Sequence, residues 1–188
     1  MDIRAWKARV EAQRQEKDRF FARDPQSPVP PYTRGAFQGL AYFPPDPAYR
    51  FVLQLNEHET KEVIDVIDTT NQTRRFWRWG QFQFEIEGVS CALQVYKSDP
   101  DEDRLFVPFR DKTSGDETYG AGRYLDFEPD PHRIADGRWV VDLNEAYNPW
   151  CAYSDAYACP LVPPENWLQI PIRAGEKAYE PMHPQTGR

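Results

Sequence analysis

The first residues of the chain have the hydrophobic spacing of a helix. Apolar residues recur on one loosely shared face of residues 2–23: Ile3, Trp6, Val10, Phe20 and Phe21. Asp2 can cap the helix, and the Asp24-Pro25 step ends it, because the residue before a proline avoids helical backbone angles. The middle of this face is polar at Gln13 and Lys17, so we expect firm packing only at the two ends of the helix.

From residue 49 the hydrophobic period changes to two, which is the period of a strand with one face toward water. In one stretch the alternation is strict and predicts that Phe82, Phe84 and Ile86 are buried, while Gln81, Gln83 and Glu85 are more exposed. Similar patterns predict about nine strands, over residues 49–56, 60–68, 74–79, 82–86, 89–95, 105–109, 123–127, 138–144 and 167–173.

No helix of useful length is predicted between these strands, so a parallel sheet with crossover helices is not expected. The pattern is typical of a mainly β fold: an antiparallel meander, barrel-like or sandwich-like, with an N-terminal helix. We divide the chain into this helix (1–24), a proline-rich connecting segment (25–48), a β domain (49–178) and a tail (179–188). The tail is polar and is expected to be poorly ordered.

Charge and composition narrow the choice of partners. The net charge of −7 repels phosphate backbones, so no nucleic-acid partner is expected. The one basic cluster, Arg74, Arg75 and Arg78, is interleaved with aromatic residues; we interpret it as an amphipathic strand, with base stacking as the alternative. The sequence has no membrane-spanning run, no apolar signal core and only three cysteines, which indicates a cytoplasmic protein of undefined oligomeric state.

Familiar catalytic and cofactor signatures are absent from the sequence. It contains no phosphate-binding glycine loop, G-x-S-x-G elbow, H-E-x-x-H motif or paired C-x-x-C motif. The three histidines are scattered, so no metal site is expected and no cofactor can be assigned.

The first unusual region runs from Phe109 to Tyr124 and is dense in hydrogen-bonding side chains. Arg123 shares a strand face with apolar Leu125 and Phe127, so we expect it to be mostly buried and paired with a carboxylate from Asp142, Glu117 or Asp111. Two interpretations stay open. The arginine belongs to a structural ion pair, or its spare donors hold an anionic ligand.

The second unusual region is the aromatic stretch from Asn144 to Pro160, which contains Cys151 and Cys159. Two cysteines at this spacing can bind a metal, form a disulfide or supply a nucleophile. A metal would need further ligands that are not nearby in the sequence, and a nucleophile would need a base. We favour free cysteines that act as small hydrophobic residues, and we expect no zinc site.

These two regions carry a family resemblance. The run Phe109-Arg110-Asp111-x-Thr113-Ser114-Gly115-x-Glu117-Thr118-Tyr119-Gly120-x-Gly122-Arg123-Tyr124-Leu125 resembles the central motif of a bacterial and archaeal family, domain of unknown function 1684. The stretches 142–153, 159–166 and 172–176 resemble it too. Trp150 and Val162 stand where the family pattern has proline. The resemblance implies no known activity, cofactor or substrate, but it singles out the same polar loops.

Our first functional hypothesis is that the open end of a barrel-like domain binds a small polar or anionic molecule. The residues expected at this site are Arg110, Asp111, Thr113, Glu117, Tyr119, Arg123, Asn144, Asn148, Cys151 and Tyr153. The alternatives are an enzyme at the same place, with Glu117 or Asp111 as base and Cys151 as nucleophile, or a structural domain whose polar cluster only holds the fold together.

Overall fold

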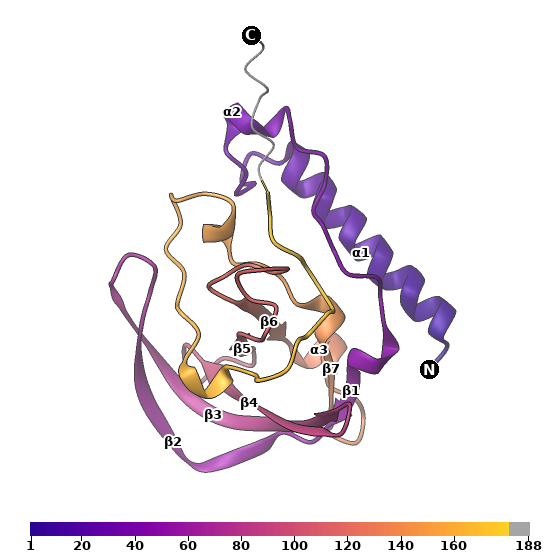
Figure 1. Cartoon of the computed structure of the whole chain (residues 1–188). Coiled ribbons are helices and arrows are strands. Elements are labelled where there is room, and N and C mark those ends of the chain that lie inside the picture. Colours follow the sequence, from indigo (N-terminus) through magenta and orange to yellow (C-terminus); the bar gives the residue numbers. More distant parts are fainter. Residues whose placement is uncertain (181–188) are drawn as a thin grey trace.

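Helix α1 (Ile3–Arg23) confirms the predicted N-terminal helix and covers one side of the β body in the computed structural model, which describes residues 1–180 (Figure 1). The Asp2 carboxylate caps the helix by accepting the N–H groups of Arg4 and Ala5. Trp6, Val10 and Phe21 are the buried residues of this helix. They lie toward its two ends, and the polar middle is left less tightly packed, as the hydrophobic pattern indicates.

Seven strands form two antiparallel sheets in the described part of the chain. The first sheet contains five strands in sequence order: β2 (Asn56–Ile67), β3 (Thr73–Ile86), β4 (Val89–Lys97), β5 (Leu105–Phe109) and β6 (Arg123–Phe127). The second pairs β1 (Arg50–Leu53) with β7 (Trp139–Asp142). The predicted mainly β fold class is confirmed. Of its two alternatives, sandwich-like fits the structure, because the sheets do not close into a barrel.

Two of the differences between the nine predicted strands and the seven observed ones have a local cause. The stretches 74–79 and 82–86 belong to the single strand β3, which continues through Gly80 with a register irregularity between Arg78 and Gly80. The predicted strand 167–173 is absent. This segment follows the short helix η4 (Pro164–Asn166), and Pro171 has no N–H to donate, so its contacts with residues 110–112 are isolated hydrogen bonds rather than a ladder.

The interior of the β body is apolar and filled. Phe82, Phe84 and Ile86 are buried, Gln83 and Glu85 are exposed and Gln81 is intermediate, so the predicted alternation is confirmed. Side chains from both sheets form one core that includes Phe109 and Phe127 of the first sheet and Trp139 and Val141 of the second. A ligand site inside the sheets is therefore not available, and pockets have to be sought between the β body and the segments around it.

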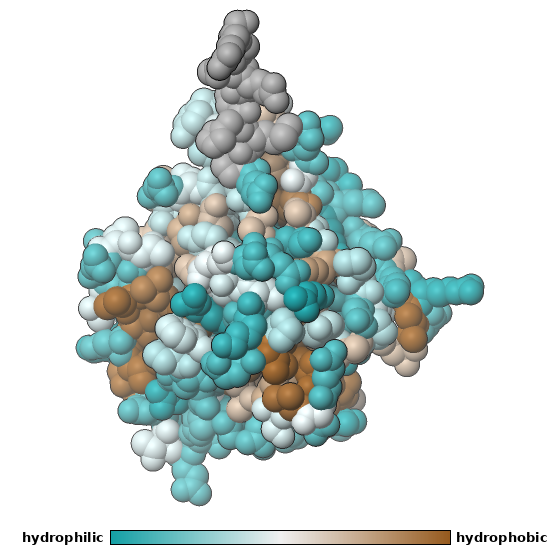
Figure 2. Space-filling model, viewed as in Figure 1, coloured by the Kyte–Doolittle hydropathy of each residue, from teal (hydrophilic) through white to brown (hydrophobic). Residues whose placement is uncertain are grey.

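Those surrounding segments are short helices and loops. Besides η4, the short helices are α2 (Pro31–Arg34), η1 (Pro47–Tyr49), α3 (Pro129–His132), η2 (Leu143–Glu145) and η3 (Trp150–Ala152). Apolar side chains on the face seen in Figure 2 lie in separate patches between hydrophilic ones. Tyr179 packs against Phe37 and Tyr153, whereas the predicted tail from residue 181 onward lies outside the described residues. The proposed division into four segments stays a prediction.

Candidate functional site

Arg123 is buried at the start of β6 and holds the C-terminal segment in place. Its Nη2 donates to Asp111 Oδ2 at 2.9 Å and to the carbonyl of Ile172 at 2.8 Å. Its Nη1 donates to the carbonyls of Ala174 and Glu176. Burial lowers the pKa of Arg123 and the Asp111 charge opposes that shift, but an arginine stays charged at neutral pH. The sequence prediction of a buried Arg123 with a carboxylate partner is confirmed, and the partner is Asp111.

Asp111 uses its second oxygen to order the loop that follows β5. Oδ1 accepts from the backbone N–H of Thr113 at 2.8 Å, from the Thr113 hydroxyl at 2.6 Å and from the N–H of Ile172 at 3.0 Å. Thr113 also shares a hydrogen bond with Thr118. Both oxygens of this carboxylate are thus engaged inside the protein, and the arrangement joins β5, β6 and residues 172–176 into one buried network.

Asp142 lies in a different network, beneath α1. The fully buried carboxylate accepts from Trp6 Nε1 at 2.7 Å and from the backbone and side-chain nitrogens of Asn144 at 3.0 and 2.8 Å, and Arg50 Nε lies 3.4 Å away. Burial raises the pKa of Asp142, and the hydrogen bonds from Asn144 and Trp6 oppose that shift. Asn144 also exchanges two hydrogen bonds with the backbone of Asp46.

Glu176 forms the centre of a third cluster, and the sequence prediction did not include it. Its buried carboxylate accepts from Lys17 Nζ at 2.7 Å, from the N–H of Asn148 at 3.1 Å and from the Tyr153 hydroxyl. Burial raises the pKa of Tyr153, so its hydroxyl keeps its proton and remains a donor. Asn148 and Tyr153 are thus brought together, but through a carboxylate from the C-terminal segment.

The remaining predicted residues lie toward the surface. The Arg110 guanidinium stacks on the Trp167 ring, 4.7 Å from its centroid. Glu117 forms an exposed ion pair with Arg173, whose Nη2 lies 2.8 Å away. The Tyr119 hydroxyl donates to Cys151 Sγ at 3.7 Å.

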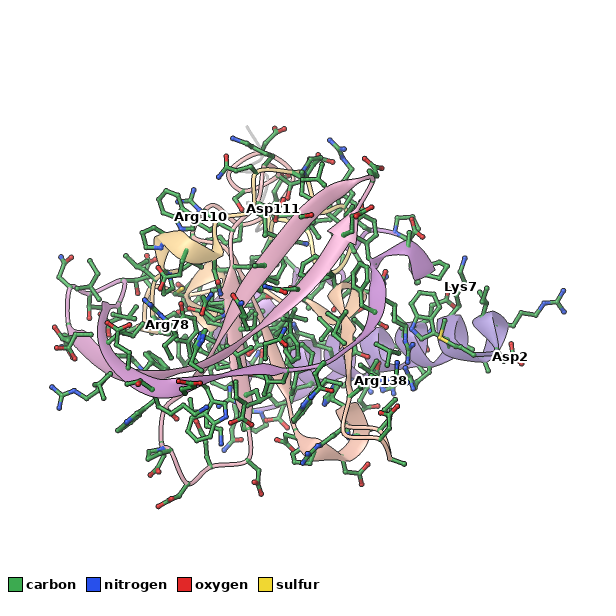
Figure 3. The ribbon with its side chains drawn as sticks, turned by 90° about the horizontal axis from the view of Figure 1, so that it is seen from below. Asp2, Lys7, Arg78, Arg110, Asp111 and Arg138 are labelled. Carbon is green, nitrogen blue, oxygen red and sulfur yellow. The ribbon has the colours of Figure 1, made fainter. Side chains whose placement is uncertain are left out.

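The predicted site residues therefore do not converge on one cavity. They distribute over the Arg123–Asp111 network, the Asp142 network, the Glu176 cluster and three surface contacts. Figure 3 shows Arg110 and Asp111 well away from Asp2 and Lys7 at the start of α1. Nearly all of these side chains hold loops and the C-terminal segment against the β body.

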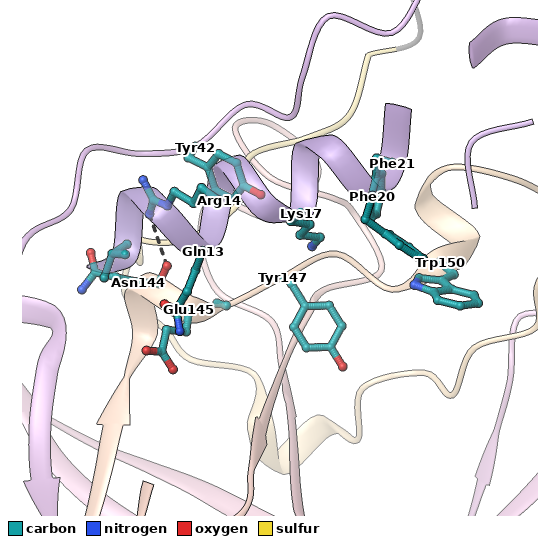
Figure 4. A pocket seen from close by; sticks show the side chains of 12 residues that line it. Gln13, Arg14, Lys17, Phe20, Phe21, Tyr42, Asn144, Glu145, Tyr147 and Trp150 are labelled. Carbon is teal, nitrogen blue, oxygen red and sulfur yellow. Dashed lines mark hydrogen bonds between the residues drawn. The ribbon is translucent and has the colours of Figure 1, made fainter. Parts of the chain in front are cut away.

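A pocket of about 500 Å³ lies between α1 and residues 144–150 (Figure 4). Its walls are mostly apolar and aromatic: Val10, Phe20, Phe21, Ala146, Tyr147 and Trp150. It forms where the apolar face of the helix is interrupted, because Gln13, Arg14 and Lys17 occupy the central turns and cannot fill the space as a hydrophobic side chain would. In the sequence, the polar residues in the middle of this face predict weak packing of the helix, and the structure has the pocket at that place.

Lys17 is the polar group that lies among the aromatic walls of the pocket. Its ammonium lies 5.1 Å from the centroid of the Tyr147 ring and 5.3 Å from that of Phe21, and its side chain is 26% exposed. Figure 4 shows it extending from α1 toward Tyr147. Arg14 is held more rigidly, because it donates to the carbonyls of Phe43 and Asn144 at 2.8 and 3.2 Å. The pocket thus combines aromatic walls with two cations, Lys17 and Arg14, and with the carboxylate of Glu145.

Neither a metal centre nor a membrane-spanning helix is found in residues 1–180. No group of three or more His, Cys, Asp or Glu side chains in this range could hold a metal ion. No helix in the same range is long and apolar enough to cross a bilayer.

Comparison with known proteins places the chain in a family. The model of a protein family of unknown function, DUF1684, matches residues 35–177, which is most of the chain. The chain belongs to the DUF1684 family. Among curated proteins, none matches the sequence.

A solved structure of a similar protein supports the architecture. The chain is similar to an uncharacterised protein of Haloarcula marismortui that has a solution NMR structure. The two sequences are 44% identical, and the alignment covers 94% of this chain and 96% of that protein. The two structures superimpose with a TM-score of 0.71. The DUF1684 match contains the Arg123–Asp111 network and residues 144–150, whereas α1, the other wall of the pocket, precedes residue 35.

An ion pair that includes the pocket residue Glu145 should make the stability of the DUF1684 chain depend on pH. His132 Nε2 lies 3.4 Å from Glu145 Oε2, and the hydrogen bond with Glu145 raises the pKa of His132 above its ordinary value of 6.5. The folded state therefore binds this proton more tightly than the unfolded state. Its contribution to stability is complete below about pH 6.5 and is lost as the pH rises through the higher folded-state pKa.

We expect His132→Gln to melt at a lower temperature than the wild-type protein at about pH 5.5, and the difference to shrink by about pH 8.5. Thermal melts of both proteins across this range test the expectation. A difference that grows with pH, or that does not change, would contradict the assigned ion pair.

Proposed function

We propose that the protein binds a small organic acid with a flat, apolar body in the pocket between α1 and residues 144–150. The observation that carries this proposal is the Lys17 side chain, which is 26% exposed and places its ammonium among aromatic rings at a pocket wall. An aromatic-lined cavity with a few polar groups is the usual form of a small-molecule site.

The size of the pocket suits a small metabolite. A volume of about 500 Å³ falls in the range of roughly 300–1,000 Å³ that is typical of ligand sites. Phe20, Tyr147 and Trp150 offer ring surfaces against which a planar group can pack. Trp150 is 41% exposed, so part of this wall is accessible from solvent.

The hydrogen-bonding capacity of Lys17 favours an acidic group on the ligand. An ammonium has three N–H donors. Among residues 1–180, Lys17 donates to Glu176 alone, which leaves two donors for a ligand oxygen. A carboxylate accepts such donors more strongly than a neutral group does, because its hydrogen bonds are charge-assisted.

The other predicted site residues support a structural role for the polar cluster around Arg123 rather than a second binding site or a catalytic centre. Asp111 is engaged on both oxygens, and Glu117 is paired with Arg173, so neither is free to act as a base. Of the predicted residues, Asn144 lines the proposed pocket. We propose that the remainder fix the loops and the C-terminal segment.

We further propose that the protein has no nucleic-acid partner and works in a reducing compartment such as the cytoplasm. Each arginine of the basic cluster is paired with a carboxylate: Arg74 with Asp68, Arg75 with Asp65, and Arg78 with Glu62 and Glu165. This pairing leaves little free positive charge for a phosphate backbone. The three cysteines are free thiols, which fits a reducing environment.

A pair of matched variants tests the binding proposal. Gln13 is exposed and lines the pocket, whereas Gln15 is exposed two residues further along α1 and does not line it. We expect benzoate to bind the wild-type protein in roughly the millimolar range, as befits so small a probe. Gln13→Trp should abolish this binding by filling the pocket, and Gln15→Trp should leave it unchanged.

The measurement is a ligand-observed NMR titration with benzoate, and with benzamide as its neutral counterpart. Benzoate should bind at least about tenfold more tightly than benzamide, because only the anion forms a charge-assisted bond with Lys17. Equal affinity for the two probes, or benzoate binding that survives Gln13→Trp, would refute the proposed site.

A further inference from the structure

Cys151 and Cys159 are held against each other by backbone contacts on both sides. The N–H of Cys151 donates to Cys159 Sγ at 3.3 Å. Cys159 is anchored to the turn between β2 and β3, because its carbonyl accepts from the N–H of Thr69 at 3.0 Å and its own N–H donates to the Thr69 hydroxyl at 3.2 Å. Both cysteines are free thiols. The loop of residues 152–158 thus starts and ends at two cysteines that are joined by a hydrogen bond.

Each of the two cysteines lines its own surface cavity. Cys159, although largely buried, lines a cavity of about 390 Å³ together with Arg74, Phe106 and Tyr124. Cys151 is half-buried and lines a second cavity, on the side of Tyr153 and Tyr157. The first cavity brings a small uncharged oxidant to the wall that Cys159 helps to form.

The surroundings of the two thiols are unequal. The pKa of Cys159 is lowered, because its thiolate accepts hydrogen bonds from the side chain and the N–H of Cys151. The positive charge of Arg74 lowers this pKa further. The hydrogen bond with Cys159 and burial raise the pKa of Cys151, while the Tyr119 hydroxyl opposes that shift. Since the thiolate is the reactive form of cysteine, Cys159 is the better nucleophile of the two.

We propose that Cys151 and Cys159 form a reversible dithiol–disulfide pair whose oxidant is hydrogen peroxide or a small organic hydroperoxide, with Cys159 as the attacking sulfur. This redox site is separate from the pocket under α1 and does not depend on the ligand proposed there.

The reaction balances in two steps. The Cys159 thiolate attacks one peroxide oxygen, so an S–O bond forms and the O–O bond breaks. The leaving hydroxide, or the alkoxide of an organic hydroperoxide, takes up a proton to become water or the alcohol. Cys151 then attacks the sulfur of the Cys159 sulfenic acid. The S–S bond forms, the S–O bond breaks, and the proton released by Cys151 leaves with the hydroxyl group as water. Two electrons pass from the sulfurs to the peroxide, and an added dithiol returns them.

Peptide mass spectrometry of the whole protein tests this inference. After brief treatment with hydrogen peroxide, free thiols are blocked with iodoacetamide and the protein is digested with trypsin. Cleavage after Arg138 and Arg173 places both cysteines in one peptide, 139–173, and cleavage after Arg78 and Lys97 isolates Cys91 in peptide 79–97. We expect peptide 139–173 to lose the mass of two hydrogen atoms and to take up no blocking group, and dithiothreitol to reverse the change.

Cys91 is the matched control, because it is half-buried and, in the described residues, its thiol forms a hydrogen bond only with the carbonyl of Val89, at 3.6 Å. Cys91→Ser should form the disulfide at the wild-type rate. In Cys151→Ser, Cys159 should be trapped as a sulfenic acid by dimedone, at least about tenfold faster than Cys151 in Cys159→Ser. The pair is refuted if peptide 139–173 of the wild-type protein remains fully alkylated while Cys91 oxidises, and equal trapping rates would overturn the role of Cys159.

Discussion

Arg123→Met is expected to lower the free energy of unfolding by about 3–5 kcal/mol, the range typical of breaking a buried ion pair by removing one partner. Methionine can occupy the apolar part of the space, but it donates no hydrogen bonds. Asp111 Oδ2 and the carbonyls of Ile172, Ala174 and Glu176 then lose their donor inside the protein. The whole C-terminal segment should loosen with them.

Urea unfolding of the wild-type protein, Arg123→Met and Arg173→Met measures this effect. Arg173 also pairs with a carboxylate, Glu117, but its side chain is 56% exposed, so its replacement should leave stability nearly unchanged. If Arg123→Met were as stable as the wild-type protein, the guanidinium would not be the buried link that its hydrogen bonds indicate.

Gly122→Ala is expected to lower stability by about 2–5 kcal/mol. Gly122 has a φ of +102°, where a side chain costs roughly 1–2 kcal/mol. A Cβ there would also lie 2.6 Å from both the Phe109 carbonyl oxygen and Val162 Cγ2, and overpacking of that kind costs roughly a further 1–3 kcal/mol. The position needs glycine for its backbone angle and for the close approach of β5.

Gly88→Ala separates the two contributions. Gly88 also has a positive φ, +78°, but a Cβ there would meet nothing within 4 Å. We expect it to cost about 1–2 kcal/mol, and less than Gly122→Ala, in the same urea experiment. Equal losses at the two glycines would show that the close packing around Gly122 is unimportant.

The fold was largely predictable where hydrophobic periodicity is unbroken. The alternation through Phe82, Phe84 and Ile86 identified a strand and its buried face, and the Asp24-Pro25 step identified the end of α1. Prediction failed over residues 167–173, because an extended segment and a strand have the same side-chain alternation. Only the hydrogen-bond partners distinguish them, and here one acceptor is the side chain of Asp111.

The candidate site was less predictable, because its partners come from distant parts of the chain. The strand pattern around Arg123 correctly indicated burial, and the structure selected Asp111 over Asp142. The sequence gives no sign that backbone carbonyls of residues 172–176 accept the other donors, or that Glu176 meets Lys17 of α1. Such contacts depend on the path of the C-terminal segment, and local pattern does not determine that path.

The most direct test of where this protein binds a ligand is an amide-detected NMR titration of the labelled protein with benzoate. We expect chemical-shift changes to centre on the two walls of the pocket, at Lys17 and Phe21 in α1 and at Ala146 and Trp150 opposite, with little change around Asp111 and Arg123. Changes confined to residues 110–124, or no changes at all, would contradict a binding pocket under α1.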